Sequence, residues 1–299
     1  MRKMIIAASL ASATLVLPGL ALAQAAAPAA APAAAPAPTP DFTFTGNAGL
    51  FSSYRFRGIA QTFDKAAIQG GMDFSHVSGF YLGNWDSNVN SGAGYPGGDI
   101  EMDFYGGWKK TWGDWGIDVG TLYYYYPGTN ASPTINNSPF NNKTGNIRNG
   151  SVHNQDIYIA GSWKWITLKY SDAISDYFST PNTKNSGYTD LSANYDLGGG
   201  WGINGHVGHL DFKNVTNGSY TDWKLGVTKD LGGWAPSLNG WVVSASYIDT
   251  NAKGNCSAAT LTNPQPYCFN NGSFTAAGAP DKTKDAGKGI AVVSISKTF

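Results

Sequence analysis

The strongest constraint on the fold is an alternation of residue types from Phe42 to Arg57. Even positions are mostly apolar or aromatic, whereas odd positions are mostly polar and end in Arg55 and Arg57. Successive side chains of a β-strand point to opposite faces, so this pattern predicts a strand with one apolar face and one polar face. The two arginines share the polar face of that strand.

The same period of two recurs along the chain in segments of about 9 to 11 residues, the length that crosses a bilayer at a tilt. We predict strands at residues 43–57, 66–76, 79–88, 99–109, 115–126, 154–163, 165–172, 187–196, 201–210, 219–229, 239–249 and 288–299. An even number of antiparallel strands closes with both chain ends on one side. The predicted fold is all-β, a transmembrane up-and-down β-barrel of about twelve strands.

The start of the chain has a different character. Residues 1–23 combine a basic start, an apolar stretch and the small-residue site Ala21-Leu22-Ala23, as in a bacterial secretory signal peptide. Residues 24–41 are rich in Ala and Pro, which predicts a semi-rigid linker. No later stretch approaches the ~20 apolar residues that a membrane-spanning helix needs. Residues 42–299 are therefore expected to form the barrel.

Loop lengths and tryptophans predict the orientation. The connections after His76, Lys110, Trp163, Asp196 and Asp230 are short, whereas residues 127–153, 172–187 and 250–287 are long. Short periplasmic turns and long extracellular loops are typical of outer-membrane barrels. Tryptophans that fall beside the short turns would form an aromatic girdle at the periplasmic rim: Trp108, Trp112, Trp115, Trp163, Trp165, Trp201, Trp234 and Trp241.

The charge balance excludes some partners. The chain has 20 basic and 20 acidic residues, and removal of Arg2 and Lys3 with the signal leaves 18 against 20, a net charge of −2. Nucleic-acid binding needs a basic excess or stripe, so no such partner is predicted. The only two cysteines, Cys256 and Cys268, lie close together in a polar segment, and a disulfide is favoured over free thiols in an exported protein.

Nearly all charged residues of the predicted strands lie on the polar faces. Lys297 is the clearest exception on an apolar face, and its side chain can extend to the membrane surface. We assign these charged residues to the lumen: Arg55, Arg57, Asp73, Asp86, Asp99, Glu101, Asp103, Lys109, Asp118, Asp156, Lys169, Asp190, Asp222 and Lys224. Nine of these are acidic and five are basic. If the lumen conducts, that excess favours cations, unless local pairing removes it.

A pore constriction is predicted near the extracellular ends of two strands. Arg55 and Arg57 would face the acidic row Asp99, Glu101 and Asp103, because alternate residues of a strand share a face. Opposed rows of charge could select solutes through a transverse field, or could be interior salt bridges that stiffen the barrel. A divalent cation on the acidic row is a weaker alternative, since the arginines favour charge pairing. Further lumen-facing charges are Asp73, Asp118, Lys109 and Lys224.

Other chemistry has little support. His206 and His209 would point to opposite faces of one strand, so they cannot easily share a metal, and we predict no metal or cofactor. The string GWGING at residues 200–205 has no helix to receive phosphates. Serines flank His76 in a tight turn, which gives no catalytic triad, so the chain is not expected to be an enzyme. A soluble lipocalin-type barrel would also alternate, but it has eight strands.

Residues 51–89, FSSYRFRGIAQTFDKAAIQGGMDFSHVSGFYLGNWDSNV, resemble the opening of the TorF-family porins, a bacterial outer-membrane group with a YRFRG-type first strand. The segments TDWKLGVTKDLGG and WVVSASYIDT also look like that family. The closing SISKTF resembles the outer-membrane signature in which an aromatic residue, here Phe299, is read by the barrel-assembly machinery; Lys297 departs from it. The resemblance implies a barrel and a pore, without a substrate.

Together these patterns predict a porin-like channel for passive diffusion of small hydrophilic solutes or ions. Its place would be the outer membrane of a Gram-negative bacterium, among outer-membrane lipids and lipopolysaccharide. A closed structural or adhesive barrel and a lipid-hydrolysing barrel enzyme are the alternatives. A number of twelve strands does not by itself decide the width of the pore. Inward glycines leave room in the lumen (Gly71, Gly116, Gly120, Gly202 and Gly226), whereas inward tyrosines narrow it (Tyr105, Tyr124 and Tyr126).

Overall fold

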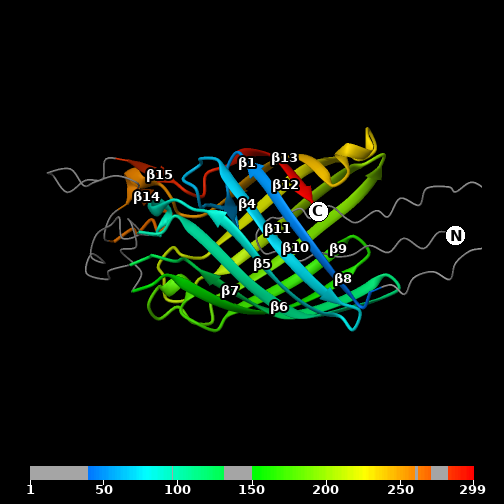
Figure 1. Ribbon diagram of the computed structural model, residues 1–299. Coiled ribbons are helices and arrows are strands. Elements are labelled where there is room, and N and C mark those ends of the chain that lie inside the picture. Colours follow the sequence, from blue (N-terminus) through cyan, green and yellow to red (C-terminus); the bar gives the residue numbers. More distant parts are fainter. Residues whose placement is uncertain (1–39, 96, 131–149, 260–261, 271–281) are drawn as a thin grey trace, which may run out of the picture.

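The protein forms a closed barrel of twelve antiparallel strands, seen in a computed structural model (Figure 1). The structure describes residues 40–95, 97–130, 150–259, 262–270 and 282–299. The barrel strands are β1 (Phe42–Phe51), β4 (Ala67–His76), β5 (Phe80–Asn88), β6 (Ile100–Trp112), β7 (Trp115–Tyr125), β8 (His153–Trp163), β9 (Ile166–Ala173), β10 (Gly187–Gly198), β11 (Trp201–Asp211), β12 (Tyr220–Asp230), β13 (Trp241–Thr250) and β16 (Ile290–Thr298). The all-β fold class and the strand number are confirmed.

Each barrel strand pairs with its neighbours in sequence, and the first and last strands close the ring. β1 pairs with β4 from Phe42↔His76 to Phe51↔Ala67. On its other edge β1 pairs with β16 from Asn47↔Thr298 to Phe51↔Ser294. The Phe299 amide adds a 2.8 Å hydrogen bond to the Gly46 carbonyl. Closure leaves the barrel wall without a free edge.

The remaining elements are short and lie in the connections. They are the strands β2 (Arg55–Phe56), β3 (Ile59–Ala60), β14 (Cys268–Asn270) and β15 (Thr283–Asp285), and the 3₁₀ helices η1 (Ser91–Ala93), η4 (Tyr177–Ser179), η5 (Pro236–Leu238) and η6 (Cys256–Ala258). None of the helices in the described part of the chain is long and apolar enough to span a membrane.

The outer surface of the barrel is apolar. Phe44 is 62% exposed, Ile68 70% and Leu82 60%, and each points outward from its strand. Water-soluble proteins rarely expose a continuous apolar band of this kind, whereas membrane barrels carry one. The apolar face is therefore outside, which rules out the inverted arrangement of a soluble lipocalin-type barrel.

The two ends of the barrel differ, as the sequence predicted. At one end, here called the turn end, strands are joined by short connections at residues 77–79, 113–114, 164–165, 199–200 and 231–240. Exposed tryptophans gather at this end: Trp112, Trp115, Trp163, Trp165, Trp201 and Trp234. At the other end, the loop end, most connections are longer, and Figure 1 shows β14 and β15 there, away from the C-terminus.

Tyrosine rings occupy the space above several inward glycines. A Cβ added to Gly120 would lie 2.5 Å from the Tyr158 hydroxyl, and one on Gly83 would lie 2.5 Å from the Tyr105 ring. Gly107 has the same relation to Tyr81. Glycine in a strand permits such a close approach because it has no side chain. These glycines therefore accommodate aromatic rings and do not widen the lumen.

The first strand ends six residues earlier than predicted, and this is the main error of the sequence interpretation. β1 stops at Phe51, and the chain then turns away from the barrel wall. Arg57 has φ of 48° and Gly58 has φ of 79°, both in the left-handed region, which a continuing strand cannot contain. Arg55 and Arg57 consequently lie on a separate hairpin.

Candidate functional site: the barrel lumen

Residues 53–62 form a hairpin inside the barrel, which we call the lumen hairpin. All ten of its residues are buried. Its two arms are β2 and β3, paired through Arg55↔Ala60 and Phe56↔Ile59. The Gln61 amide donates to the Tyr54 carbonyl at 2.9 Å, which closes the base of the hairpin. The hairpin thus fills the lumen with a small element that has its own backbone hydrogen bonds.

Arg57 at the hairpin tip reaches the far wall of the barrel. Its guanidinium donates to Asp156 of β8 at 2.8 Å, and the two side chains are only 1% and 3% exposed. It also donates to the Tyr177 hydroxyl at 3.0 Å and stands 4.3 Å from the ring centroid of Tyr188 on β10. The Tyr220 hydroxyl of β12 donates to the Arg57 carbonyl at 2.7 Å. The tip is therefore fixed to three strands across the lumen from β1.

Arg55 ties the hairpin to the long connection between β13 and β16. It donates to Asp64 at 2.6 Å and to the Ala286 carbonyl at 2.8 Å. Asp64 also accepts from Lys284 of β15 at 2.7 Å. β15 pairs with β14, whose first residue, Cys268, forms the predicted disulfide with Cys256.

A second carboxylate stands at this junction. Burial raises the pKa of Asp285, against the opposing effects of the Gly287 amide and Arg55.

Aromatic side chains pack around the hairpin inside the barrel. Phe56 of the hairpin packs edge-on against Tyr124 at 5.4 Å and Phe178 at 5.6 Å. Tyr54 packs against Trp85 at 5.3 Å. Together with neighbouring residues they make one continuous buried cluster. Among the described residues, this half of the lumen is packed much as a protein interior is.

The predicted acidic row is only partly in the lumen and does not meet the arginines. Glu101 and Asp103 face inward from β6 and are 1% and 4% exposed. Asp99 precedes β6 and is exposed, so its assignment to the lumen is wrong. Arg57 pairs with Asp156 and Arg55 with Asp64. The opposed rows of charge are therefore not formed, because the hairpin carries both arginines away from the wall.

The other predicted lumen charges are mostly engaged by tyrosines. Tyr105 donates to Asp73, and Tyr81 donates to Asp118, each at 2.6 Å. The Lys109 ammonium stands 5.1 Å from the centroid of the Tyr81 ring.

One further assignment to the lumen is wrong. Asp86 pairs in register with Met102 and Gly70, which belong to the outward faces of their strands, so it faces outward.

The histidines do not form a metal site. His206 faces the lumen, with Nδ1 2.8 Å from Asp190 and Nε2 3.4 Å from Asp222. His209 points outward and contacts the Thr221 hydroxyl at 3.0 Å. In the described part of the chain, no group of three or more His, Cys, Asp or Glu residues could hold a metal ion. His76 contacts Ser78 at 2.7 Å within its own turn.

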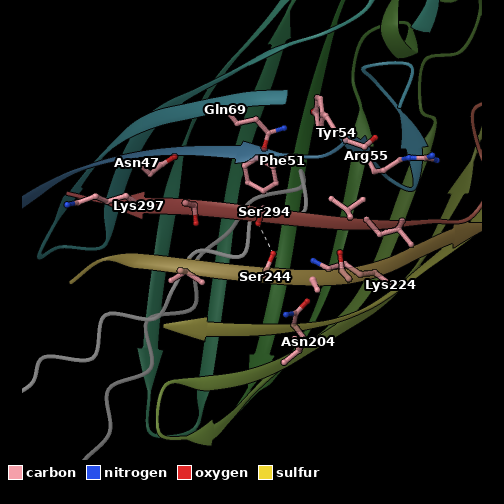
Figure 2. Close-up of a pocket in the computed structure, with 18 of the residues that line it drawn as sticks. Asn47, Phe51, Tyr54, Arg55, Gln69, Asn204, Lys224, Ser244, Ser294 and Lys297 are labelled. Atoms are coloured by element: carbon pink, nitrogen blue, oxygen red, sulfur yellow. Dashed lines mark hydrogen bonds between the residues drawn. The ribbon is translucent and has the colours of Figure 1, made fainter. Parts of the chain in front are cut away.

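A polar cavity lies below the lumen hairpin, toward the turn end (Figure 2). The space inside it that the centre of a water molecule can reach is about 50 Å³. Residues of β1, β4, β11, β12, β13 and β16 line it, most of them inward-facing, and Ser53, Tyr54 and Arg55 of the hairpin form its inner end. Figure 2 shows Tyr54 and Arg55 at the end of the cavity away from Lys297.

Serines dominate the wall formed by β13 and β16. Ser244, Ser246, Ser294 and Ser296 line the cavity, and the hydroxyls of Ser244 and Ser294 are 2.7 Å apart. These serines were not predicted as site residues, because the predicted site was built from charged residues alone. Their signal was present as serines that alternate with apolar residues in VVSAS and VVSIS. Period two places such serines on one face, opposite the apolar face.

The fold and the lumen define a closed twelve-stranded barrel with an apolar exterior, a polar cavity and an inserted hairpin. The chain belongs to a family described as "Bacterial protein of unknown function (Gcw_chp)", whose model matches residues 34–299. That description does not carry the TorF name, which stays a prediction. No curated protein matches the sequence.

Solved porin structures resemble the barrel at very low sequence identity. The chain resembles the KdgM porin with a TM-score of 0.47 and 6% identity, over 85% of this chain and 98% of that one. For the NanC porin the TM-score is 0.45 and the identity 9%, over 86% and 99% of the two chains. For OccAB1 of Acinetobacter baumannii the values are 0.43 and 10%, over 88% and 66%.

Proposed function

We propose that this protein is a porin-like channel of a bacterial outer membrane, through which small hydrophilic solutes pass when the lumen hairpin moves. The observation that carries the proposal is the cavity lined by serines, asparagines and a lysine, which runs from the hairpin to Lys297 and Thr298 near the turn end, inside a barrel with an apolar exterior. A buried polar surface is costly unless water or a polar solute contacts it. In this proposal the turn end faces the periplasm and the loop end faces outward.

The lumen hairpin supports a gated channel over a permanently open one. It crosses the lumen with ten buried residues, and its tip is held by the ion pair between Arg57 and Asp156. The same packing also favours a second candidate, a closed barrel with a structural or adhesive role. The two functions differ in one respect: a gate must leave its site at a measurable frequency.

Single-channel recording in planar bilayers separates the two candidates. We would compare the wild-type protein with a variant in which a short Gly-Ser linker replaces residues 53–62. Heat-modifiable migration on a gel would establish that both barrels are folded. A gated channel predicts brief conductance steps in the wild type and long-lived steps in the variant.

Two outcomes would count against the channel. A silent wild type with a conducting variant identifies the hairpin as a permanent plug and favours the closed barrel. Folded proteins that both stay silent would contradict a conducting path of any kind.

A further inference from the structure

The cavity below the hairpin carries a lysine without a partner. Lys224 projects inward from β12, and Figure 2 shows it reaching toward Ser244. No hydrogen bond, ion pair or ring contact joins its ammonium group to any residue in the described part of the chain. Asp190, the carboxylate that attracts Lys224 electrostatically, contacts His206 at 2.8 Å. A cation held inside a barrel in this way is poorly compensated.

The charged residues that line the cavity are basic, although acidic residues outnumber basic ones in the predicted lumen. The charged residues among its described lining are Arg55, Lys224 and Lys297, all basic. The Lys297 ammonium lies over the rings of Trp241 and Phe299 at the rim, 5.3 Å and 5.7 Å from their centroids. The acidic residues named above are engaged or buried elsewhere. Arg55 is paired with Asp64, and Lys297 shares the outer face of β16 with Val293 and Ile295, so the charge that projects into the cavity is that of Lys224.

Neutral hydrogen-bonding groups line the same cavity as Lys224. Asn204 on the neighbouring strand β11 is 7% exposed, and its buried side-chain oxygen has no hydrogen-bond partner among the described residues. The Ser53 hydroxyl at the inner end of the cavity is also buried without a partner there. Buried polar groups normally have partners, and those that lack one in a cavity are candidates for contact with a ligand. The four serines of β13 and β16 extend this surface toward the rim.

We propose that this cavity binds a small polyhydroxylated carboxylate, with the carboxylate on Lys224 and the hydroxyls on Asn204 and the serines. A lysine ammonium forms charge-assisted hydrogen bonds with a carboxylate, and amides and hydroxyls both donate to and accept from alcohols. This inference deepens the proposed function by naming the class of solute, and as a statement about transport it rests on that function. The lining runs from the hairpin to Lys297 and Thr298 near the turn end of β16, so we expect a ligand to enter from that end while the hairpin stays in place.

Binding is tested directly on the folded wild-type protein by isothermal titration calorimetry, in a detergent without sugar head groups. Three probes separate the contributions of charge and hydroxyls. D-gluconate has both groups, sorbitol has the hydroxyls without the carboxylate, and acetate has the carboxylate without the hydroxyl chain. We expect gluconate to bind at least about tenfold more tightly than either of the others, since one charge-assisted hydrogen bond corresponds to about that factor. Equal affinity for gluconate and sorbitol, or for gluconate and acetate, overturns the proposal.

A matched pair of variants locates the site. Lys224→Met should weaken gluconate binding at least about tenfold, because methionine keeps the length of the side chain and removes the charge. Lys109→Met is the control, since Lys109 faces the lumen from β6 and lies against Tyr81, outside the cavity. It should change the affinity less than about twofold. Unchanged binding in Lys224→Met, or equal loss in both variants, places the ligand elsewhere and contradicts the assignment.

Failure of binding and failure of the channel are distinguishable. Gluconate binding by a barrel that never conducts supports the site and rejects the channel. A conducting barrel that does not bind gluconate rejects the site and keeps the channel. The comparison of probes on the wild-type protein needs no variant, so the proposal is testable even if Lys224→Met fails to fold.

Discussion

Replacing Asp156 with asparagine tests whether the buried ion pair holds the lumen hairpin across the barrel. The Arg57 and Asp156 side chains are 1% and 3% exposed and 2.8 Å apart, so solvent screens the pair little. Removing one partner of a buried pair leaves an uncompensated charge and costs about 3–5 kcal/mol. Because the charge lies on the hairpin tip, the hairpin should leave its site before the barrel strands separate.

Hydrogen exchange measured by mass spectrometry reads this local opening. The Ala60 amide donates to the Ala286 carbonyl at 2.9 Å, a bond that breaks when the hairpin leaves. Since each 1.4 kcal/mol is a factor of ten, a loss of about 3 kcal/mol should speed exchange in residues 53–62 by roughly a hundredfold. Peptides from β8, which carries Asp156, should keep their protection because the strand ladder is intact.

Two further variants make the result specific. Arg57→Met combined with Asp156→Asn removes both charges, so it should open the hairpin less than the sum of the two single changes. Lys164→Met is the control, because it breaks an exposed pair with Asp114 at 3.9 Å, and such pairs contribute about 0–1 kcal/mol. Unchanged exchange of the hairpin in Asp156→Asn, or an equal rise in β8, would refute the reasoning.

Three other changes give independent checks. Gly120→Ala should lower the free energy of unfolding of the barrel by about 1–3 kcal/mol, because the added Cβ would lie 2.6 Å from the Gly106 carbonyl oxygen. Gly161→Ala is the control and should leave the stability unchanged, because its Cβ would meet no atom within 4 Å. Urea titration of the folded fraction compares the two variants. Gly58→Ala should raise the frequency of channel opening in planar bilayers, because Gly58 has φ of 79° and an added Cβ would lie 2.7 Å from Asp222 Cβ. An unchanged opening frequency would show that the hairpin tip tolerates a side chain at this position. Replacing Cys256 and Cys268 with serine should destabilise the connection after β13 by about 3 kcal/mol and speed hydrogen exchange in residues 282–286. Unaltered hydrogen exchange would contradict a role for the disulfide in holding β15 near Arg55.

Most of the barrel was predictable from the sequence because a barrel strand is a local pattern. Alternation separates the outward-facing from the inward-facing positions of most strands, and it needs no knowledge of which strands are neighbours. Loop lengths and tryptophans then fix the two ends, and the spacing of Cys256 and Cys268 in an exported chain indicates the disulfide. The predicted boundaries of the other eleven strands lie within three residues of the observed ones.

The path of the lumen hairpin could be known only from the tertiary structure. The alternation from Phe42 continues through Arg57, so the sequence gives no local sign that the wall ends at Phe51. The contacts that direct the chain inward are remote: Arg57 is 99 residues from Asp156 and 163 from Tyr220. A period-two pattern identifies a face but not the partner that meets it. The inward path of the hairpin, the serine cavity and the place of Lys224 in that cavity therefore follow only from the tertiary structure.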